Sequence, residues 1–177
     1  MIYYILSGIA AVVILLVVVI SRQPDEFRVT RTATINAPVA KVFEQINNFY
    51  NWQFWSPWVK LDPTAKVTLE GSPQGVGAIS RWAGNSKIGE GSMTITESKS
   101  DEVILIDLEF IKPFKANNKT EFTFKAEGEN QTVVTWTMTG KNSFMSKTIS
   151  LIMNCEKMVG GQFEEGFANL KAAVESK

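Results

Sequence analysis

A series of short alternating segments followed by one long amphipathic segment restricts most strongly how this chain can fold. Apolar and polar residues alternate, with many β-branched and aromatic side chains, in seven stretches: residues 27–35, 66–69, 77–83, 91–97, 103–111, 119–126 and 132–140. Such alternation is typical of half-buried β-strands. Turn-forming residues separate the later stretches at hairpin spacing. The pattern therefore predicts an antiparallel sheet built mainly from consecutive strands.

The segment from about residue 146 to 175 has the period of a helix instead. Its apolar residues recur at intervals of three and four, which predicts one unusually long amphipathic helix. These residues are Ile149, Ile152, Met153, Val159, Phe163, Phe167, Leu170 and Val174. Gly160 and Gly161 are expected to interrupt this helix with a bend or a close approach of another backbone. A long helix packed against a strongly curved antiparallel sheet would bury both apolar faces, so we expect an α+β fold.

A tryptophan cluster lies between the first strand and the rest of the sheet. Pro38 fits the first turn of a helix that follows the first strand. Three of the five tryptophans then fall within seven residues, at Trp52, Trp55 and Trp58. Tryptophan usually needs a partner for its indole N–H, so such a cluster is rarely incidental. It either closes one end of a core or forms the wall of a pocket for an apolar ligand.

The N-terminus carries a nearly unbroken apolar run over residues 1–20. About 20 such residues in a helix cover a hydrocarbon core of roughly 30 Å. The run has no basic n-region and no small-residue cleavage site, which favours an uncleaved anchor over a signal peptide. We therefore expect a transmembrane anchor over 1–21, a linker over 22–26 and a globular domain over 27–177. Arg22, Arg28 and Arg31 follow the span and favour a cytoplasmic domain.

Composition excludes several classes of function. Lys+Arg and Asp+Glu are both 18, so no excess of positive charge points to nucleic acid. Histidine is absent, which excludes Ser-His-Asp and Cys-His nucleophile arrangements, histidine-ligated zinc and imidazole acid–base catalysis. Cys155 is the one cysteine and cannot form an internal disulfide. No metal and no cofactor are expected.

The strand faces indicate what lies between the sheet and the long helix. Alternation places Ile106, Leu108 and Phe110 on one face, and Asp107 and Glu109 on the solvent side, where catalysis by the two carboxylates is not expected. The inner face is aromatic and rich in methionine, which suits either a filled core or an adaptable apolar cavity. Apolar candidates for the lining are Trp82, Met93, Phe110, Phe122, Trp136, Met138 and, from the helix, Met153. Arg81 and Glu90 are candidates to hold a ligand head group, or form an exposed hairpin pair.

Several segments resemble the START-like superfamily, also called SRPBCC, and within it bacterial polyketide cyclase/dehydrase and lipid-transport-like proteins. They comprise the strand-to-helix entry at 35–43, the Trp-x-x-Trp-Ser-Pro-Trp signature at 52–58, and shorter matches at 82–85, 89–93, 134–138 and 157–160. The resemblance spans roughly residues 26–175. It implies a helix-grip fold, in which a curved antiparallel sheet wraps around a long C-terminal helix. It also implies a cavity for a hydrophobic or amphipathic small molecule between the two.

Three hypotheses about function follow from the residues and the resemblance. The leading one is a membrane-anchored module that binds a lipid, an isoprenoid or an aromatic metabolite. The second is a cyclase or dehydratase-type enzyme, although no catalytic motif of such enzymes transfers residue by residue. The third is a protein-interaction module that uses an exposed sheet face, as in Hsp90-activator-like relatives.

Overall fold

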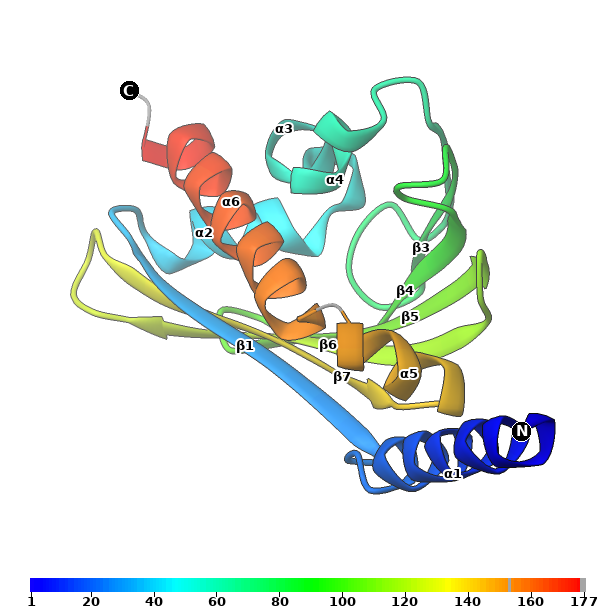
Figure 1. Ribbon diagram of the computed structural model, residues 1–177. Helices are drawn as coiled ribbons and strands as arrows, with labels where there is room; N and C mark the ends of the chain where they lie inside the picture. Colours follow the sequence, from blue (N-terminus) through cyan, green and yellow to red (C-terminus); the bar gives the residue numbers. More distant parts are fainter. Residues whose placement is uncertain (153, 176–177) are drawn as a thin grey trace.

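A computed structural model of the chain describes residues 1–152 and 154–175. Its main element is one seven-stranded antiparallel sheet in the order β1-β7-β6-β5-β4-β3-β2 (Figure 1). The strands are β1 (Glu26–Ile35), β2 (Lys66–Gly71), β3 (Ala78–Ala83), β4 (Glu90–Lys99), β5 (Val103–Lys112), β6 (Ala116–Ala126) and β7 (Thr132–Lys141). Every strand expected from alternation is present, and β1 closes the order by pairing with the last strand. The helix-grip fold is therefore confirmed.

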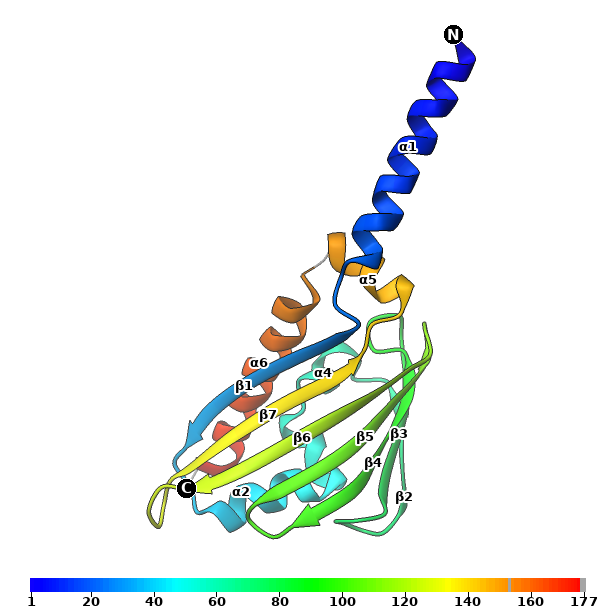
Figure 2. The same ribbon diagram turned by 90° about the horizontal axis from the view of Figure 1, so that it is seen from below.

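The sheet curves around the C-terminal helix. Two register shifts between β4 and β5, at Glu90/Gly91 and at Ile95/Glu97, accompany this curvature. Such bulges bend a strand and increase its local twist. Seen from below, the strands run as a twisted layer with the helices against one side (Figure 2). This concave side is called the inner face below.

Four short helical segments connect β1 to β2. They are α2 (Val39–Asn47), η1 (Phe49–Asn51), α3 (Trp52–Trp55) and α4 (Pro57–Leu61). Asn48 begins η1 by accepting a hydrogen bond from the backbone N–H of Tyr50. Pro57 occupies the first turn of α4, where its missing N–H costs nothing. The tryptophan cluster thus lies on two helical turns joined at Ser56.

The prediction of one uninterrupted C-terminal helix, made from periodicity, is wrong in one respect. Two helices are present, α5 (Phe144–Ile152) and α6 (Cys155–Glu175), and the break falls before Cys155 instead of at Gly160 and Gly161. The side chain of Asn154 accepts a hydrogen bond from the backbone N–H of Lys157 at 2.9 Å. This is the geometry of an N-cap, which starts a new helix at this point.

The apolar core lies between the inner face and helices α2, α3 and α6. Its fully buried large side chains come from all of these elements: Trp55, Trp136, Phe122, Phe163, Ile35, Ile46, Ile95, Ile104, Ile106, Leu170, Val42 and Val134. The C-terminal end of α6 is held by Lys41, which donates to the Val174 carbonyl, and by Glu175, which accepts from the Asn36 N–H. The C-terminal end of α6 is therefore fixed to the segment that follows β1, and the helix packs on β1 and α3.

Helix α1 (Ile2–Ser21) projects away from the domain (Figure 2). Among the described residues it is the one helix long and apolar enough to cross a membrane, and nearly all of it is exposed; a signal sequence has the same features. Pro24 and Asp25, in the linker after α1, are bonded to the domain. Asn142 donates from its backbone to Asp25 and from its side chain to Pro24, and Lys147 of α5 donates to the Asp25 carboxylate.

Candidate functional site

The tryptophan cluster belongs to the core, where it packs on Phe122 and Trp136 in the middle of β6 and β7. The indole N–H of Trp52 donates to the Ile46 carbonyl at 3.0 Å, and that of Trp55 donates to the Gln45 carbonyl at 3.1 Å. Both side chains are buried. Each indole therefore fastens its helical turn to the end of α2, which satisfies the polar group that a buried tryptophan carries.

Trp136 of β7 is the centre of the aromatic packing. Its ring stacks on Phe163 of α6, with ring centroids 3.9 Å apart and planes 7° from parallel. Phe122 lies at 4.7 Å on the neighbouring strand, and Trp58 meets the ring edge-on at 5.6 Å. Gly166 permits this arrangement, because an added Cβ would lie 3.0 Å from the Trp136 ring. The space between α6 and this half of the sheet is thus filled by aromatic side chains.

The inner face opens toward the end of the sheet where α1 leaves. Along β5, Ile104 and Ile106 are fully buried, whereas the next inner residues, Leu108 and Phe110, are half-buried. The neighbouring strands repeat this gradient at Met93 of β4 and Trp82 of β3. Their register partners place all four half-buried residues on the inner face. Trp82, Met93, Leu108 and Phe110 are called the open end below.

Three polar side chains lie among these apolar residues. Ser80, Asn118 and Thr120 are 6%, 9% and 5% exposed and alternate onto the inner face. In the described part of the chain their side chains make no hydrogen bond to another residue. The indole N–H of Trp136, on the same face, is fully buried and has no partner among the described residues. Buried polar groups are nearly always paired, so such a group calls for an explanation.

Trp82 is held in place at the open end by a short loop, residues 84–89. Its indole N–H donates to the Ile88 carbonyl at 3.0 Å, and its ring packs edge-on against Phe110 at 5.8 Å. The ring also covers Gly91, where an added Cβ would lie 2.5 Å from it. Asp62 fixes the loop by accepting from the Asn85 N–H.

Asp62 is a buried carboxylate with several donors. The Thr64 hydroxyl and the backbone N–H groups of Asn85 and Thr64 all donate to it, and they hold its pKa below the usual carboxyl value. Because these donors stabilise the ionised form, Asp62 serves as a structural anion that ties the end of α4 to the loop beside Trp82.

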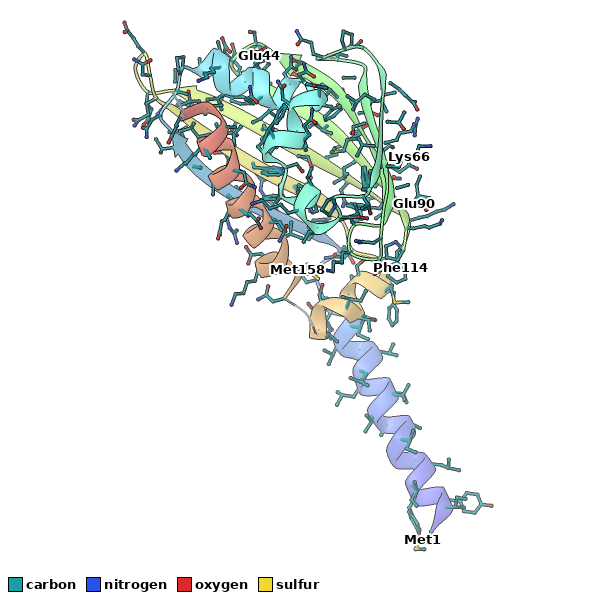
Figure 3. All side chains as sticks on the ribbon, turned by 90° about the horizontal axis from the view of Figure 1, so that it is seen from above. Met1, Glu44, Lys66, Glu90, Phe114 and Met158 are labelled. Carbon is teal, nitrogen blue, oxygen red and sulfur yellow. The ribbon has the colours of Figure 1, made fainter. Side chains whose placement is uncertain are left out.

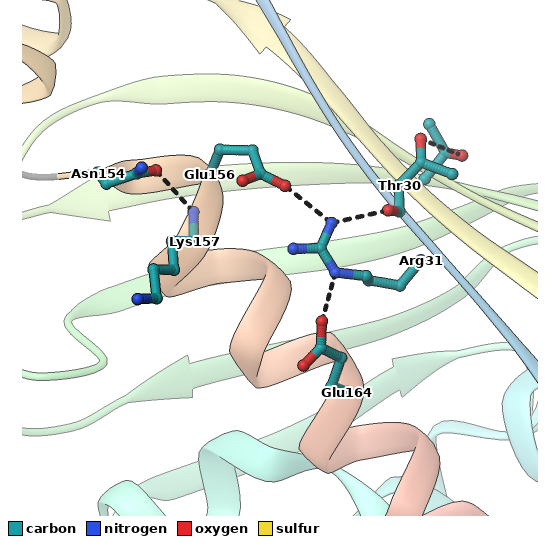
Figure 4. A network of polar contacts seen from close by, with 7 residues as sticks. Thr30, Arg31, Asn154, Glu156, Lys157 and Glu164 are labelled. Carbon is teal, nitrogen blue, oxygen red and sulfur yellow. Dashed lines mark hydrogen bonds and ion pairs between the residues drawn. The ribbon is translucent and has the colours of Figure 1, made fainter.

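Arg31 places a charge at the edge of the inner face beside α6. Its side chain bridges Glu156 at 2.8 Å and Glu164 at 2.6 Å, two turns apart on the helix (Figure 4). The hydrogen bonds that Arg31 donates to Glu156 and Glu164 raise the pKa of its guanidinium. Gly160 lies directly under it, since an added Cβ would fall 2.0 Å from a guanidinium nitrogen. The close approach expected at this glycine is therefore made by a side chain.

Arg81 and Glu90 lie apart from the other candidate residues. Register pairing puts Arg81 on the outer face, where it contacts Glu70 at 3.0 Å, and Glu90 contacts Lys112 at 2.8 Å at the rim of the sheet (Figure 3). The two residues are not paired with each other. Asp107 and Glu109 are exposed on the outer face. Met153 lies outside the described residues.

Two hollows of the described surface lie elsewhere. One, of about 470 Å³, is an open groove between α2, α3 and α6; the other, of about 320 Å³, lies between η1 and the β2–β3 turn. Neither is lined by any candidate ligand-binding residue. The described residues contain no cluster of three or more His, Cys, Asp or Glu side chains arranged to hold a metal ion.

The sequence pattern identified most of the apolar residues of the inner face but did not identify its polar residues. Trp52, Trp55, Phe122, Trp136 and Met138 are buried in the core or on the inner face. Trp58, Trp82, Met93 and Phe110 are half-buried. Ser80, Asn118, Thr120 and Arg31 were not predicted. The signal was available, because each shares the strand parity of an apolar inner residue.

A curved antiparallel sheet that grips a C-terminal helix, with an aromatic inner face, defines a START-like, or SRPBCC, protein. Residues 26–175 match the model of the polyketide cyclase / dehydrase and lipid transport family, and the chain belongs to that family. Family membership supports ligand binding in general. A search of curated protein sequences found no match.

Solved structures with the same fold share little sequence with this chain. A protein from Thermobifida fusca has a TM-score of 0.63 at 20% identity, covering 81% of this chain and 90% of its own. A protein from Nitrosospira multiformis has a TM-score of 0.59 at 21% identity, covering 84% and 96%. The Aha1 dimer from Colwellia psychrerythraea has a TM-score of 0.60 at 14% identity, also covering 84% and 96%. At such identities the likeness establishes the fold alone.

Proposed function

We propose that this chain is a membrane-anchored binding module for a hydrophobic or amphipathic small molecule, such as a lipid, an isoprenoid or an aromatic metabolite. The ligand would lie at the open end of the inner face, between strands β3 to β6 and the start of α6. The single observation that carries the proposal is the burial gradient along the inner face. Along β5, inward-facing residues change from fully buried at Ile104 and Ile106 to half-exposed at Leu108 and Phe110, toward the α1 end.

The polar groups beside the open end support an amphipathic ligand. Ser80, Asn118 and Thr120 offer neutral hydroxyl and amide groups more than nine-tenths buried. A ligand with one neutral hydrogen-bonding group and an apolar body would satisfy them while covering Leu108 and Phe110. Pockets for small molecules combine these features, a mainly apolar lining with a few placed polar groups.

Binding without catalysis is supported by where the ionisable groups lie. Asp62 and Lys147 are the buried charged residues in the described part of the chain, and both are used in structural contacts, Asp62 with the donors of Thr64 and Asn85 and Lys147 with Asp25. Arg31 is taken up by two glutamates of α6. An acid–base mechanism needs an ionisable group within reach of the ligand. The polar side chains that face the open end are those of Ser80, Asn118 and Thr120, which do not ionise.

Native mass spectrometry of the full chain, released from detergent micelles, tests the proposal. Wild-type protein should carry an apolar adduct, and Leu108→Trp should lose most of it because the larger ring fills the open end. Leu105→Trp is the matched control, since Leu105 is a half-buried leucine of the same strand on the outer face. An unoccupied wild type, or equal adduct on Leu108→Trp with unchanged thermal stability, would count against binding at this place.

The polar part of the proposal has its own pair of variants. Thr120→Val removes an inner-face hydroxyl without changing the side-chain shape, and Thr123→Val makes the same change on the outer face of β6. Loss of one hydrogen bond to a neutral ligand corresponds to about 1 kcal/mol, or roughly fivefold in affinity. We expect that loss for Thr120→Val only. If the two variants bind the ligand equally well, the ligand makes no hydrogen bond to Thr120, and the polar part of the proposal is wrong.

A further inference from the structure

The end of the domain from which α1 leaves carries a concentration of exposed apolar side chains. Six large ones are between 40% and 56% exposed there: Ile111, Phe114, Phe144, Met145, Leu151 and Met158. They come from three places that are separate in the sequence, namely the end of β5 with the turn that follows it, α5, and the first turn of α6. Figure 3 shows Phe114 and Met158 beside the base of α1. Together these six residues are called the basal patch.

Helix α5 is the centre of the basal patch and sits against the end of α1. The two helices are in contact, and Ile20 at the end of α1 is buried. Lys147 is the one charged residue of α5, and it is turned away from solvent toward Asp25. Phe144 and Met145, in the first turn of α5, are exposed. No charged side chain of α5 lies on the exposed surface beside them.

The link between α1 and the domain fixes which way the basal patch faces. Only residues 22–25 separate the end of α1 from β1, and Asn142 and Lys147 hold Pro24 and Asp25. A span of four residues reaches at most about 14 Å even when fully extended. If α1 crosses a bilayer, the basal patch cannot lie far from the surface at which α1 emerges.

The charges of the connections at this end suit the same surface. The segments at 22–25, 84–89, 113–115 and 142–143 carry Arg22, Lys87 and Lys115, against Asp25 as the one acidic residue. Basic residues at the rim of an apolar surface are attracted to anionic lipid head groups. The whole chain, by contrast, carries no net charge.

We propose that the basal patch docks on the surface of the bilayer that α1 crosses, with α5 and the β5–β6 turn in the head-group layer. This inference rests on the membrane anchor of the proposed function. The strand ends at Trp82, Glu90 and Phe110 lie at the same end of the sheet, so docking turns the open end of the inner face toward the membrane. A ligand drawn from the bilayer then reaches it without crossing water.

Fluorescence quenching in lipid vesicles tests the docking with the full chain. In a Cys155→Ser background, single cysteines carrying an environment-sensitive fluorophore are placed by Phe114→Cys, Phe144→Cys and Phe54→Cys. Phe54 is the matched control, an exposed phenylalanine at 62% on α3, away from α1 (Figure 1). The vesicles contain phosphatidylcholine and phosphatidylglycerol with spin labels on the head group. We expect several-fold stronger quenching at 114 and 144 than at 54.

A fourth label separates failure of the docking from failure of the anchor. Gly8 lies in the middle of α1 with open space around it, so Gly8→Cys reports insertion through quenching by spin labels on the acyl chains. Strong quenching at 8 with equal, weak quenching at 114, 144 and 54 would overturn the docking and leave the anchor intact. Absence of acyl-chain quenching at 8 would overturn the anchor and the docking together, while binding at the open end would still be decided by the Leu108→Trp variant.

Discussion

At the scale of single residues, the least conspicuous positions carry the most specific packing. Gly91 lets the Trp82 ring approach β4 closely, Gly166 admits Trp136, and Gly160 accommodates Arg31. Sequence reasoning singled out the tryptophans because they are large and rare. The glycines that make room for them have no side chain to reveal a partner, and only the three-dimensional contacts identify it.

The two adjacent glycines of α6 give a matched test of this packing. Gly161 faces open space, so Gly161→Ala should raise the free energy of unfolding by about 0.5–1 kcal/mol through helix propensity alone. Gly160→Ala gains the same propensity but displaces the Arg31 guanidinium from Glu156 and Glu164, and should be less stable than Gly161→Ala. In an Arg31→Ala background the two alanine variants should become equal. Denaturant unfolding of all five proteins measures this, and a difference that persists without Arg31 would show that another contact restricts Gly160.

At the scale of elements, alternation was enough for the sheet, because strand period and turn chemistry are local properties. The C-terminal helices show where local pattern fails. Apolar residues continue at helical spacing across the break before Cys155, so periodicity alone cannot detect it. The pair of glycines was the more obvious helix breaker, yet it stays helical because α6 is packed on both sides of it. A polar side chain, Asn154, decides the boundary instead.

Asn154→Ala tests this assignment of the boundary. Removing an N-cap side chain typically costs about 1 kcal/mol, so the free energy of unfolding should fall by about that amount. Hydrogen exchange should also accelerate at the first turn of α6, at Lys157 above all, because that amide loses its acceptor. Asn130→Ala, at an exposed turn between β6 and β7, is the control and should change stability by a few tenths of a kcal/mol at most. Unchanged exchange at Lys157 would mean that packing of α6, and not the cap, sets where the helix begins.

At the scale of the whole molecule, the chain was predicted as an anchor, a linker and a globular domain, and this division stays a prediction. What sequence could not reveal is that the linker is bonded to the domain, because Asn142 and Lys147 are more than a hundred residues away from Pro24 and Asp25. Similarly, the alternation along a strand identifies which residues face inward. It does not reveal whether other side chains fill the space in front of them. That depends on how α6 and the aromatic rings pack together in three dimensions.

The Asp25–Lys147 contact gives the last prediction, because its two partners are buried very unequally. The Lys147 side chain is 9% exposed and that of Asp25 is 92% exposed. Asp25→Ala leaves a buried ammonium without its partner, whereas Lys147→Met removes the buried charge and leaves a carboxylate in water. Asp25→Ala should therefore loosen α5 more than Lys147→Met does, measured by hydrogen exchange of α5 in the full chain in lipid nanodiscs.

The same contact should depend on pH in a defined direction. The hydrogen bond and charge of Lys147 lower the pKa of Asp25, so its stabilising contribution is complete above the ordinary carboxyl pKa of about 4 and is lost as the pH falls through the lowered value. Wild-type exchange in α5 should approach that of Asp25→Ala at the acid end of this window, while Lys147→Met should show no such convergence. A wild type that stays protected in α5 under acid conditions would mean that the other contacts of this region hold α5 in place, and that the orientation of the basal patch does not depend on the ion pair.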